Sequence, residues 1–312
     1  MGWDRFKSSD YDTFTATQTK DASGRTKSAG EIFTSSEMKS EFDPRNIKVR
    51  ESCDSPNNPE ATPIIVALDV TGSMGFIPHH LVAGGLGTLM NDILDKKPVS
   101  DPHLMFMGIG DVEWDSAPLQ VTQYEADVRI ADQLKDIYIE RGGGANDIES
   151  YTLPWYFAAN KTKIDAYDKR GQKGILFTVG DEGVPPILTQ EQIAQVFGDQ
   201  VPKDLTAKEL FDAVSEKYEV FHLIVQEGAN YRKNPKFVEN SWRDVLGERA
   251  ILVKDYTKIP EIIVSTLGKL NQAASPTATA KANAVSDAIA GLKGKKSSSK
   301  KAATPTFTLT AA

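Results

Sequence analysis

The sequence predicts an α/β protein with a doubly wound, mostly parallel central sheet flanked by helices. Two observations predict this fold. Short apolar runs alternate with longer amphipathic segments through the middle of the chain, which is the order of strands and helices in such sheets. The first run, residues 64–70, is almost wholly apolar, as expected of a strand that helices cover on both faces.

The remaining strands follow from the same pattern. Four further apolar runs are expected to be strands of the sheet, at residues 104–109, 174–179, 220–225 and 250–253. Residues 119–124 instead alternate apolar and polar side chains after a short gap. We therefore expect an antiparallel edge strand there, which forms a hairpin with the strand before it.

Helices are expected between these strands. The segments with helical spacing of apolar residues are 79–94, 127–139, 148–160, 206–217, 235–246 and 260–270. A sheet with this order of elements binds ligands in the crevice outside the carboxyl ends of its strands. Functional residues are therefore to be sought at those ends.

The two ends of the chain differ from its middle. Residues 1–61 are rich in Ser, Thr, Asp, Lys and Asn and show no sustained strand or helix period, so we expect an extended polar N-terminal arm. Residues 62–272 form the predicted α/β domain. Residues 273–312 are rich in Ala, Ser, Thr and Lys, which predicts a low-complexity C-terminal tail with a short helix near residues 280–292.

Composition and charge argue against several classes of protein. No apolar run approaches the roughly 18 residues that a membrane span needs, and residues 1–10 lack the apolar stretch of a secretory signal, so we expect a cytoplasmic protein that does not enter a membrane. Cys53 is the single cysteine, which rules out an intramolecular disulfide and a cysteine-rich zinc site. The net charge is -7, and the tail carries six lysines against one aspartate, so about -12 remains for the rest of the chain. That balance argues against nucleic-acid binding by the main domain.

Oxygen-bearing side chains follow the first predicted strand. The strand ends at the carboxylate of Asp69, and the hydroxyls of Thr71 and Ser73 follow at alternate positions of the next loop. Glycines in this loop permit a tight turn. Three such oxygens can converge on one hard cation such as Mg²⁺ or Mn²⁺. Asp111 and Asp181 come directly after two other strands, so carboxylates recur at the same predicted edge of the sheet.

These residues resemble the metal-ion-dependent adhesion site (MIDAS) of the von Willebrand factor A-like (vWA) family. Asp69, Thr71 and Ser73 match its D-x-[ST]-x-S loop, and Asp181 matches its later aspartate. The resemblance covers about residues 62–271 and implies the vWA fold. It also implies that the two hydroxyls bind the cation directly, that carboxylates contribute directly or through water, and that an open metal position accepts a partner's carboxylate.

The sequence departs from the family pattern in the middle loop. Ala145 stands where the family commonly places a threonine, and alanine cannot bind a metal. Asn146, Asp147 or Glu149 could compensate, and Glu149 is favoured because we expect it at the start of a helix, where its side chain can turn back toward the crevice. Asp111 is a further candidate ligand. The alternative interpretations are a turn cap for Asp111 and an acid favoured by the helix dipole for Glu149.

The resemblance implies a metal-dependent protein-binding module that is not an enzyme, whose partner presents an Asp or Glu. Some intracellular members of the family work with AAA+ ATPases of the MoxR type, so such an ATPase or an assembly is the expected partner. One alternative is a structural component, for example of a phage particle, in which the arm and the tail contact neighbouring subunits. Another is a metal-dependent, phosphoesterase-like hydrolase, although no His or Lys general acid is evident near the strand ends.

Overall fold

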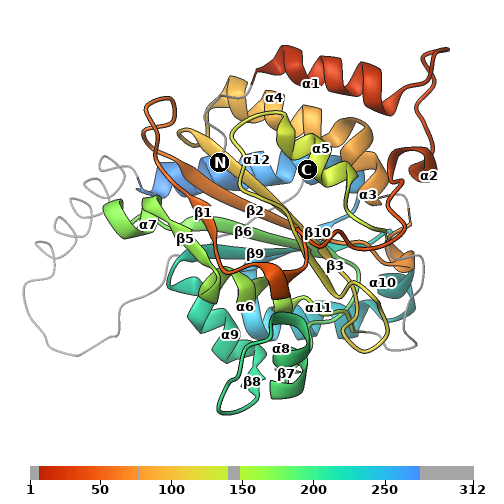
Figure 1. The fold of residues 1–312 in the computed structure, drawn as a ribbon. Coiled ribbons are helices and arrows are strands. Elements are labelled where there is room, and N and C mark those ends of the chain that lie inside the picture. Colours follow the sequence, from red (N-terminus) through yellow and green to blue (C-terminus); the bar gives the residue numbers. More distant parts are fainter. Residues whose placement is uncertain (1–6, 76, 140–147, 275–312) are drawn as a thin grey trace, which may run out of the picture.

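A computed structural model describes residues 7–75, 77–139 and 148–274, and its centre is a six-stranded sheet (Figure 1). The strand order is β10-β9-β6-β2-β3-β4, and every neighbouring pair in this sheet is parallel except β3 with β4. The strands are β2 (Thr62–Asp69), β3 (Pro102–Ile109), β4 (Leu119–Val121), β6 (Gly174–Gly180), β9 (Tyr218–Val225) and β10 (Ala250–Val253). The predicted α/β sheet and its antiparallel edge strand are confirmed.

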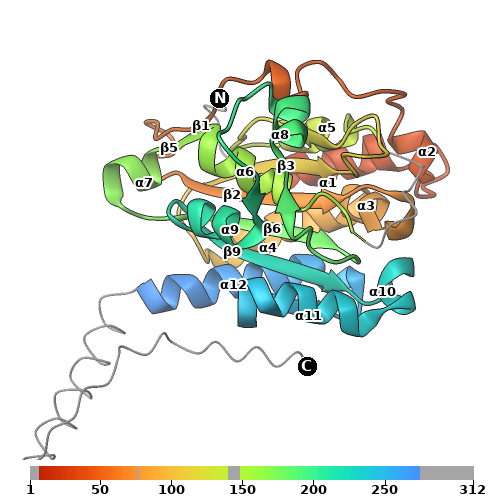
Figure 2. The same cartoon turned by 90° about the horizontal axis from the view of Figure 1, so that it is seen from below.

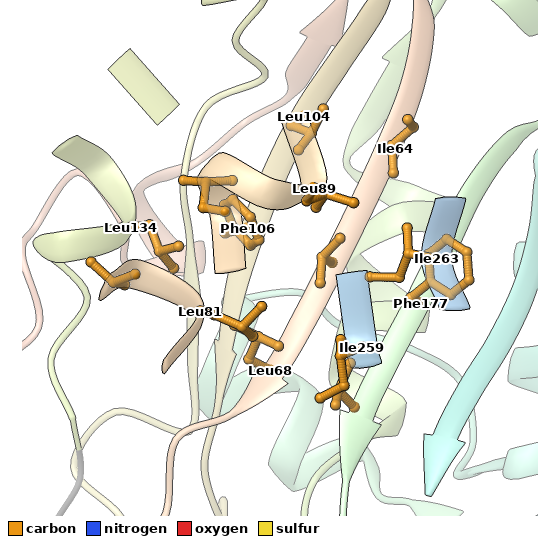
Figure 3. Packing of buried hydrophobic residues seen from close by; sticks show 14 of the residues in the cluster. Ile64, Leu68, Leu81, Leu89, Leu104, Phe106, Leu134, Phe177, Ile259 and Ile263 are labelled. Atoms are coloured by element: carbon orange, nitrogen blue, oxygen red, sulfur yellow. The ribbon is translucent and has the colours of Figure 1, made fainter. Parts of the chain in front are cut away.

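Strand β2 shows why the sequences of the inner strands are continuous apolar runs. Its side chains point alternately to the two faces of the sheet, and both faces are buried. Ile64 and Leu68 join one hydrophobic core, while Ile65 joins the other. Figure 3 shows Ile64 and Leu68 among side chains from β3, β6 and the covering helices.

Four helices that cover the first face of the sheet lie above it in Figure 1, and Figure 2 shows the molecule from below, on the other side of the sheet. They are α3 (Ile77–His80), α4 (Leu86–Lys96), α5 (Arg129–Lys135) and α12 (Ile259–Ala274). A π-helical segment, Leu81–Gly85, joins α3 to α4. The segment predicted as one helix over residues 79–94 therefore has a π-helical interruption near its start.

The second face is covered by another set of helices, with α6, α8 and α9 below the sheet in Figure 1. They are α6 (Thr152–Asn160), α8 (Gln190–Phe197), α9 (Ala207–Ser215) and α11 (Pro235–Leu246). Two short helices, α7 (Asp165–Arg170) and α10 (Ala229–Lys233), lie in the connections. Two small sheets accompany the central one: β1 (Arg50–Ser52) with β5 (Thr162–Ile164), and β7 (Ile187–Leu188) with β8 (Leu205–Thr206).

The N-terminal segment differs from the extended polar arm expected from its composition. Its described part carries α1 (Ser8–Phe14) and α2 (Ala29–Ile32), and Tyr11 and Ile32 are buried in the first core. Figure 1 shows α1 lying beside α4. The few apolar residues of the segment are spaced too irregularly to show a period. Among its described residues, Tyr11, Phe14, Ile32, Phe33, Phe42 and Ile47 are nevertheless buried, whereas Val49 is 44% exposed.

The division of the chain at residues 61 and 272 remains a prediction. Residues 275–312, which include almost all of the predicted tail and its short helix, lie outside the described residues. Within the described part of the chain, no helix combines the length and the apolar character that a bilayer crossing requires.

Candidate metal centre

The loop after β2 holds its polar side chains in a hydrogen-bonded turn. Asp69 is the last residue of β2 and is 0% exposed. Its Oδ1 accepts hydrogen bonds from the backbone N–H of Thr71 (2.9 Å) and from Thr71 Oγ1 (2.6 Å). The Oγ atoms of Thr71 and Ser73 are 3.2 Å apart. The alternating spacing thus places one carboxylate and two hydroxyls side by side, as predicted, and Asp69 lies beneath the surface.

Asp181 joins this group from the end of β6, the strand next to β2. Ser73 Oγ donates a hydrogen bond to Asp181 Oδ1 (2.8 Å), and the backbone N–H of Asn230 donates to Oδ2 (2.8 Å). The loop at Gly228 passes so close that a Cβ there would overlap the Asp181 side chain. Glycine at this position is therefore required by the close approach of the backbone to the carboxylate.

Glu149 reaches the same region from a loop and not from a helix. The helix predicted over residues 148–160 begins at Thr152, so the expected position of Glu149 at a helix start is wrong. Ile148 pairs with Gly183 in an isolated parallel bridge, and the backbone N–H of Ser150 donates to the carbonyl of Gly110 (3.3 Å). These contacts tie the loop to the ends of β6 and β3, which explains why local helix preference does not decide its conformation.

The environment of Glu149 is unusual for a carboxylate. Its side chain is 2% exposed, and among the described residues its Oε2 has no hydrogen-bond partner. Burial, followed by the charges of Asp69, Glu182 and Asp111, raises the pKa of Glu149 from 4.5 to about 11. A buried acceptor without a donor is destabilising unless another group satisfies it.

Asp111 occupies the turn after β3. Its Oδ1 accepts from the backbone N–H of Glu113 (2.8 Å), so it caps this turn, as the alternative interpretation had it. Its charge nevertheless contributes to the raised pKa of Glu149. Of the predicted ligands, the hydrogen-bonded group contains Asp69, Thr71, Ser73 and Asp181, with Glu149 buried close by and Asp111 engaged in its own turn. Their role as metal ligands remains a prediction.

Two further polar residues at this edge make contacts that were not predicted. Tyr151 is fully buried, and its hydroxyl donates to Asp69 Oδ2 (2.7 Å). Glu182 is also buried, and its Oε1 accepts from the side-chain amide of Asn230. The position of Glu182 directly after Asp181 was a usable signal, whereas nothing local in the sequence indicates the contact of Tyr151 with Asp69.

The charges of the group are poorly compensated. Burial, followed by the charge of Asp181, raises the pKa of Asp69 from 3.8 to about 7, and burial raises the pKa of Asp181. None of the ion pairs between described residues involves Asp69, Glu149 or Asp181. Buried carboxylates without a positive partner favour either protonation or a bound cation.

The chemistry of the donor set fits a hard divalent cation. Carboxylate and hydroxyl oxygens are the ligands that Mg²⁺ and Mn²⁺ prefer. Within residues 7–75, 77–139 and 148–274, no three His, Cys, Asp or Glu side chains form a ready-made metal cluster, so binding would depend on the hydroxyls of Thr71 and Ser73. Ala145, Asn146 and Asp147, named above for the middle loop, lie outside the described residues.

The sheet order, the parallel pairing around β2 and the loop from Asp69 to Ser73 together match the arrangement expected from the resemblance. The fold is vWA-like. No protein-family model and no curated protein matches the chain.

Solved structures similar to this chain come from bacteria and from the mussel byssus. The pilus adhesin SpaC from Lactobacillus rhamnosus GG has a TM-score of 0.47 and 10% identity over 70% of this chain and 31% of that chain. Proximal thread matrix protein 1 from the mussel byssus has a TM-score of 0.42 and 10% identity over 68% of this chain and 46% of that chain, and one of its structures has a zinc-occupied MIDAS motif.

A von Willebrand factor type A protein from Catenulispora acidiphila has a TM-score of 0.35 and 12% identity over 67% of this chain and 42% of that chain. This chain thus covers less than half of each of these three proteins. At such low identities, the similarity concerns the fold alone.

Proposed function

We propose that this protein is a metal-dependent protein-interaction module, in which Mg²⁺ or Mn²⁺ at the carboxyl edge of the sheet binds a carboxylate of a protein partner. The observation that carries the proposal is a set of buried acids without ion pairs, beside two hydroxyls that follow β2. A divalent cation would neutralise charge that the described side chains leave uncompensated.

The residues have separate roles in this proposal. Thr71, Ser73 and Asp181 would hold the cation, because their oxygens already lie within hydrogen-bond distance of one another. Glu149 would supply a further oxygen, since its Oε2 has no donor among the described residues. Asp69 would orient Thr71, because its carboxylate accepts hydrogen bonds from the backbone N–H and the hydroxyl of Thr71. When bound, the cation supplies a coordination position for a carboxylate of the partner.

The rim of the site suits a protein partner. Trp114 follows the Asp111 turn and is 64% exposed, and a side chain of this size at the surface is typical of interaction sites. Phe237 is also exposed, and its ring lies against Gly183, two residues beyond Asp181. Apolar side chains at the edge of a charged centre can bury against a partner whose carboxylate enters the centre.

A MoxR-type AAA+ ATPase or an assembly as the partner rests on the resemblance alone, and a cytoplasmic location rests on the sequence; these remain proposals. The structural alternative has the N-terminal arm and the tail contact neighbouring subunits, and the described part of that arm packs on its own domain. Among the described residues, no contact at the site specifically favours the hydrolase alternative.

Thermal unfolding in EDTA and in Mn²⁺ or Mg²⁺ tests the proposal. At about 100 times its dissociation constant, a bound ion stabilises the folded state by roughly 2.7 kcal/mol, which is a rise of several degrees in the unfolding midpoint for a domain of this size. Asp69→Ala should remove that rise. Asp95→Ala, which removes an exposed aspartate from α4, should keep it. A wild-type protein that does not respond to either ion, or an Asp69→Ala variant that responds as wild type does, would contradict the proposal.

A further inference from the structure

We propose that Tyr151 is a positioning residue of the metal centre, which fixes the Asp69 carboxylate behind the hydroxyls of Thr71 and Ser73. This inference rests on the proposed metal site. It concerns a residue outside the family's motif, whose hydroxyl donates a hydrogen bond to Asp69.

The hydrogen bonds of Asp69 divide between its two oxygens. Oδ1 accepts from the backbone N–H and the hydroxyl of Thr71, and Oδ2 accepts from the Tyr151 hydroxyl at 2.7 Å. With both oxygens engaged, the carboxylate plane is fixed relative to the loop. Thr71 Oγ1 is in turn held 3.2 Å from Ser73 Oγ, so the orientation of Asp69 determines where the first hydroxyl lies.

The ring of Tyr151 is itself held firmly in the second core. Its edge packs against the ring of His222 (5.1 Å between centroids) and against that of Trp242 (5.3 Å). Trp242 is anchored by a hydrogen bond from its Nε1 to the carbonyl of Glu182 (2.8 Å), and His222 Nδ1 lies 2.8 Å from Thr178 Oγ1. These contacts connect Tyr151 to β9, to α11 and to β6, the strand that Asp181 directly follows.

The remaining side of the tyrosine is closed by Gly180, the last residue of β6. A Cβ at this position would overlap the Tyr151 hydroxyl and its ring. The space that glycine leaves is therefore the space in which the hydroxyl reaches Asp69. The tyrosine has no room to swing away while the sheet and α11 stay in place.

Tyr151 acts on the proposed ligand Thr71 through Asp69, so it belongs to the outer hydrogen bonds that orient the ligands. Loss of such partners typically weakens metal binding by about 10- to 100-fold. Tyr151→Phe removes only the hydroxyl and keeps the ring, so the packing against His222 and Trp242 should survive. We expect the Mn²⁺ dissociation constant, measured by titration calorimetry, to rise by about 10- to 100-fold in this variant.

Tyr124→Phe is a matched control. Tyr124 is also a buried tyrosine of the second core, and its hydroxyl lies 2.9 Å from that of Tyr218. Tyr218 is the first residue of β9, so this pair lies at the opposite edge of the sheet from the metal centre. Both variants lose one buried hydroxyl, and both should lower the unfolding midpoint in EDTA. Only Tyr151→Phe should weaken Mn²⁺ binding.

Gly180→Ala perturbs the same contact from the other side, because its Cβ would displace the tyrosine hydroxyl, and it should also weaken Mn²⁺ binding. Wild-type affinity in a folded Tyr151→Phe protein, or an equal loss in Tyr124→Phe, would overturn the positioning role and leave the proposed function intact. A wild-type protein that does not bind Mn²⁺ would overturn the proposed function and this inference with it.

Discussion

Replacing Glu149 with glutamine is expected to stabilise the metal-free protein and to weaken its response to metal. Glu149 is 2% exposed, and its Oε2 lacks a hydrogen-bond partner among the described residues. Its pKa is raised to about 11 by burial and by the neighbouring carboxylates. Glutamine keeps the shape of the side chain and removes the charge that this environment disfavours.

The size of the effect follows from the difference in proton binding between the folded and unfolded states. Below a pH of about 4.5 both states hold the proton, so the contribution of Glu149 to stability is fully present. Above that pH the unfolded chain releases the proton while the folded protein keeps it, and stability falls as pH rises toward the folded pKa. At about pH 7.5, roughly three units above the unfolded value at about 1.4 kcal/mol per unit, the loss is on the order of 4 kcal/mol.

Urea unfolding in EDTA between about pH 5 and pH 8 measures this loss. The free energy of unfolding of wild type should fall over that range more steeply than that of Glu149→Gln. Glu216→Gln is the matched control, because Glu216 is exposed at the end of α9 and its substitution removes the same charge. With saturating Mn²⁺ the order of stability of the two proteins should change, since the ion raises the free energy of unfolding of wild type more than that of Glu149→Gln.

An equal pH dependence in wild type and Glu149→Gln would refute the reasoning. It would show that Glu149 is ionised in the metal-free folded protein, with solvent or another group satisfying Oε2. If Glu216→Gln showed the same pH dependence of the free energy of unfolding as Glu149→Gln, a general change in net charge, and not burial at the site, would be the cause of that dependence.

Two further substitutions test the packing around the site and the N-terminal segment. Gly228→Ala should lower the free energy of unfolding by about 1–3 kcal/mol and reduce the Mn²⁺ response, because the new Cβ overlaps Asp181; a wild-type urea midpoint would contradict the close approach. Tyr11→Ala should cost about 3–5 kcal/mol in the same assay, as expected for a large aromatic side chain of the core, whereas a change below about 0.5 kcal/mol would show that α1 is not part of the folded unit.

The sheet could be predicted from the sequence because its inner strands are buried on both faces. Such strands need apolar side chains at every position, and residues 64–68 meet that demand without reference to any distant part of the chain. The carboxyl ends of the strands then follow from the topology. The proximity of Asp69 and Asp181 could be predicted for the same reason, since the parallel strands β2 and β6 are adjacent and end at the same edge of the sheet.

The shorter helices and the loops depended on weaker signals. Helix α8 begins with a capping box formed by Thr189 and Gln192, a pattern that can be recognised in the sequence. The loop before α6 gave no such signal, because the bridge from Ile148 to Gly183 competes with helix formation over residues 148–151. Local preference alone places Glu149 at the start of a helix.

Burial of the site could not be predicted either. In the sequence, Asp69 is a charged residue at the end of an apolar strand, and such residues usually lie at the surface. In the fold its carboxylate is hydrogen-bonded by Tyr151, which is 82 residues away in the sequence. The N-terminal segment is a second case, because its few apolar residues, such as Tyr11 and Ile32, stand in a polar stretch without a period, and tertiary packing decides which of them are buried.

The two glycines that approach Tyr151 and Asp181 provide a way to recognise relatives of this protein. A side chain at Gly180 would occupy the place of the Tyr151 hydroxyl, and one at Gly228 would occupy the place of the Asp181 carboxylate. A sequence can therefore retain the D-x-T-x-S loop and still be unable to assemble this centre. Glycine at both positions, together with the tyrosine, separates chains that share the centre from chains that share only the fold.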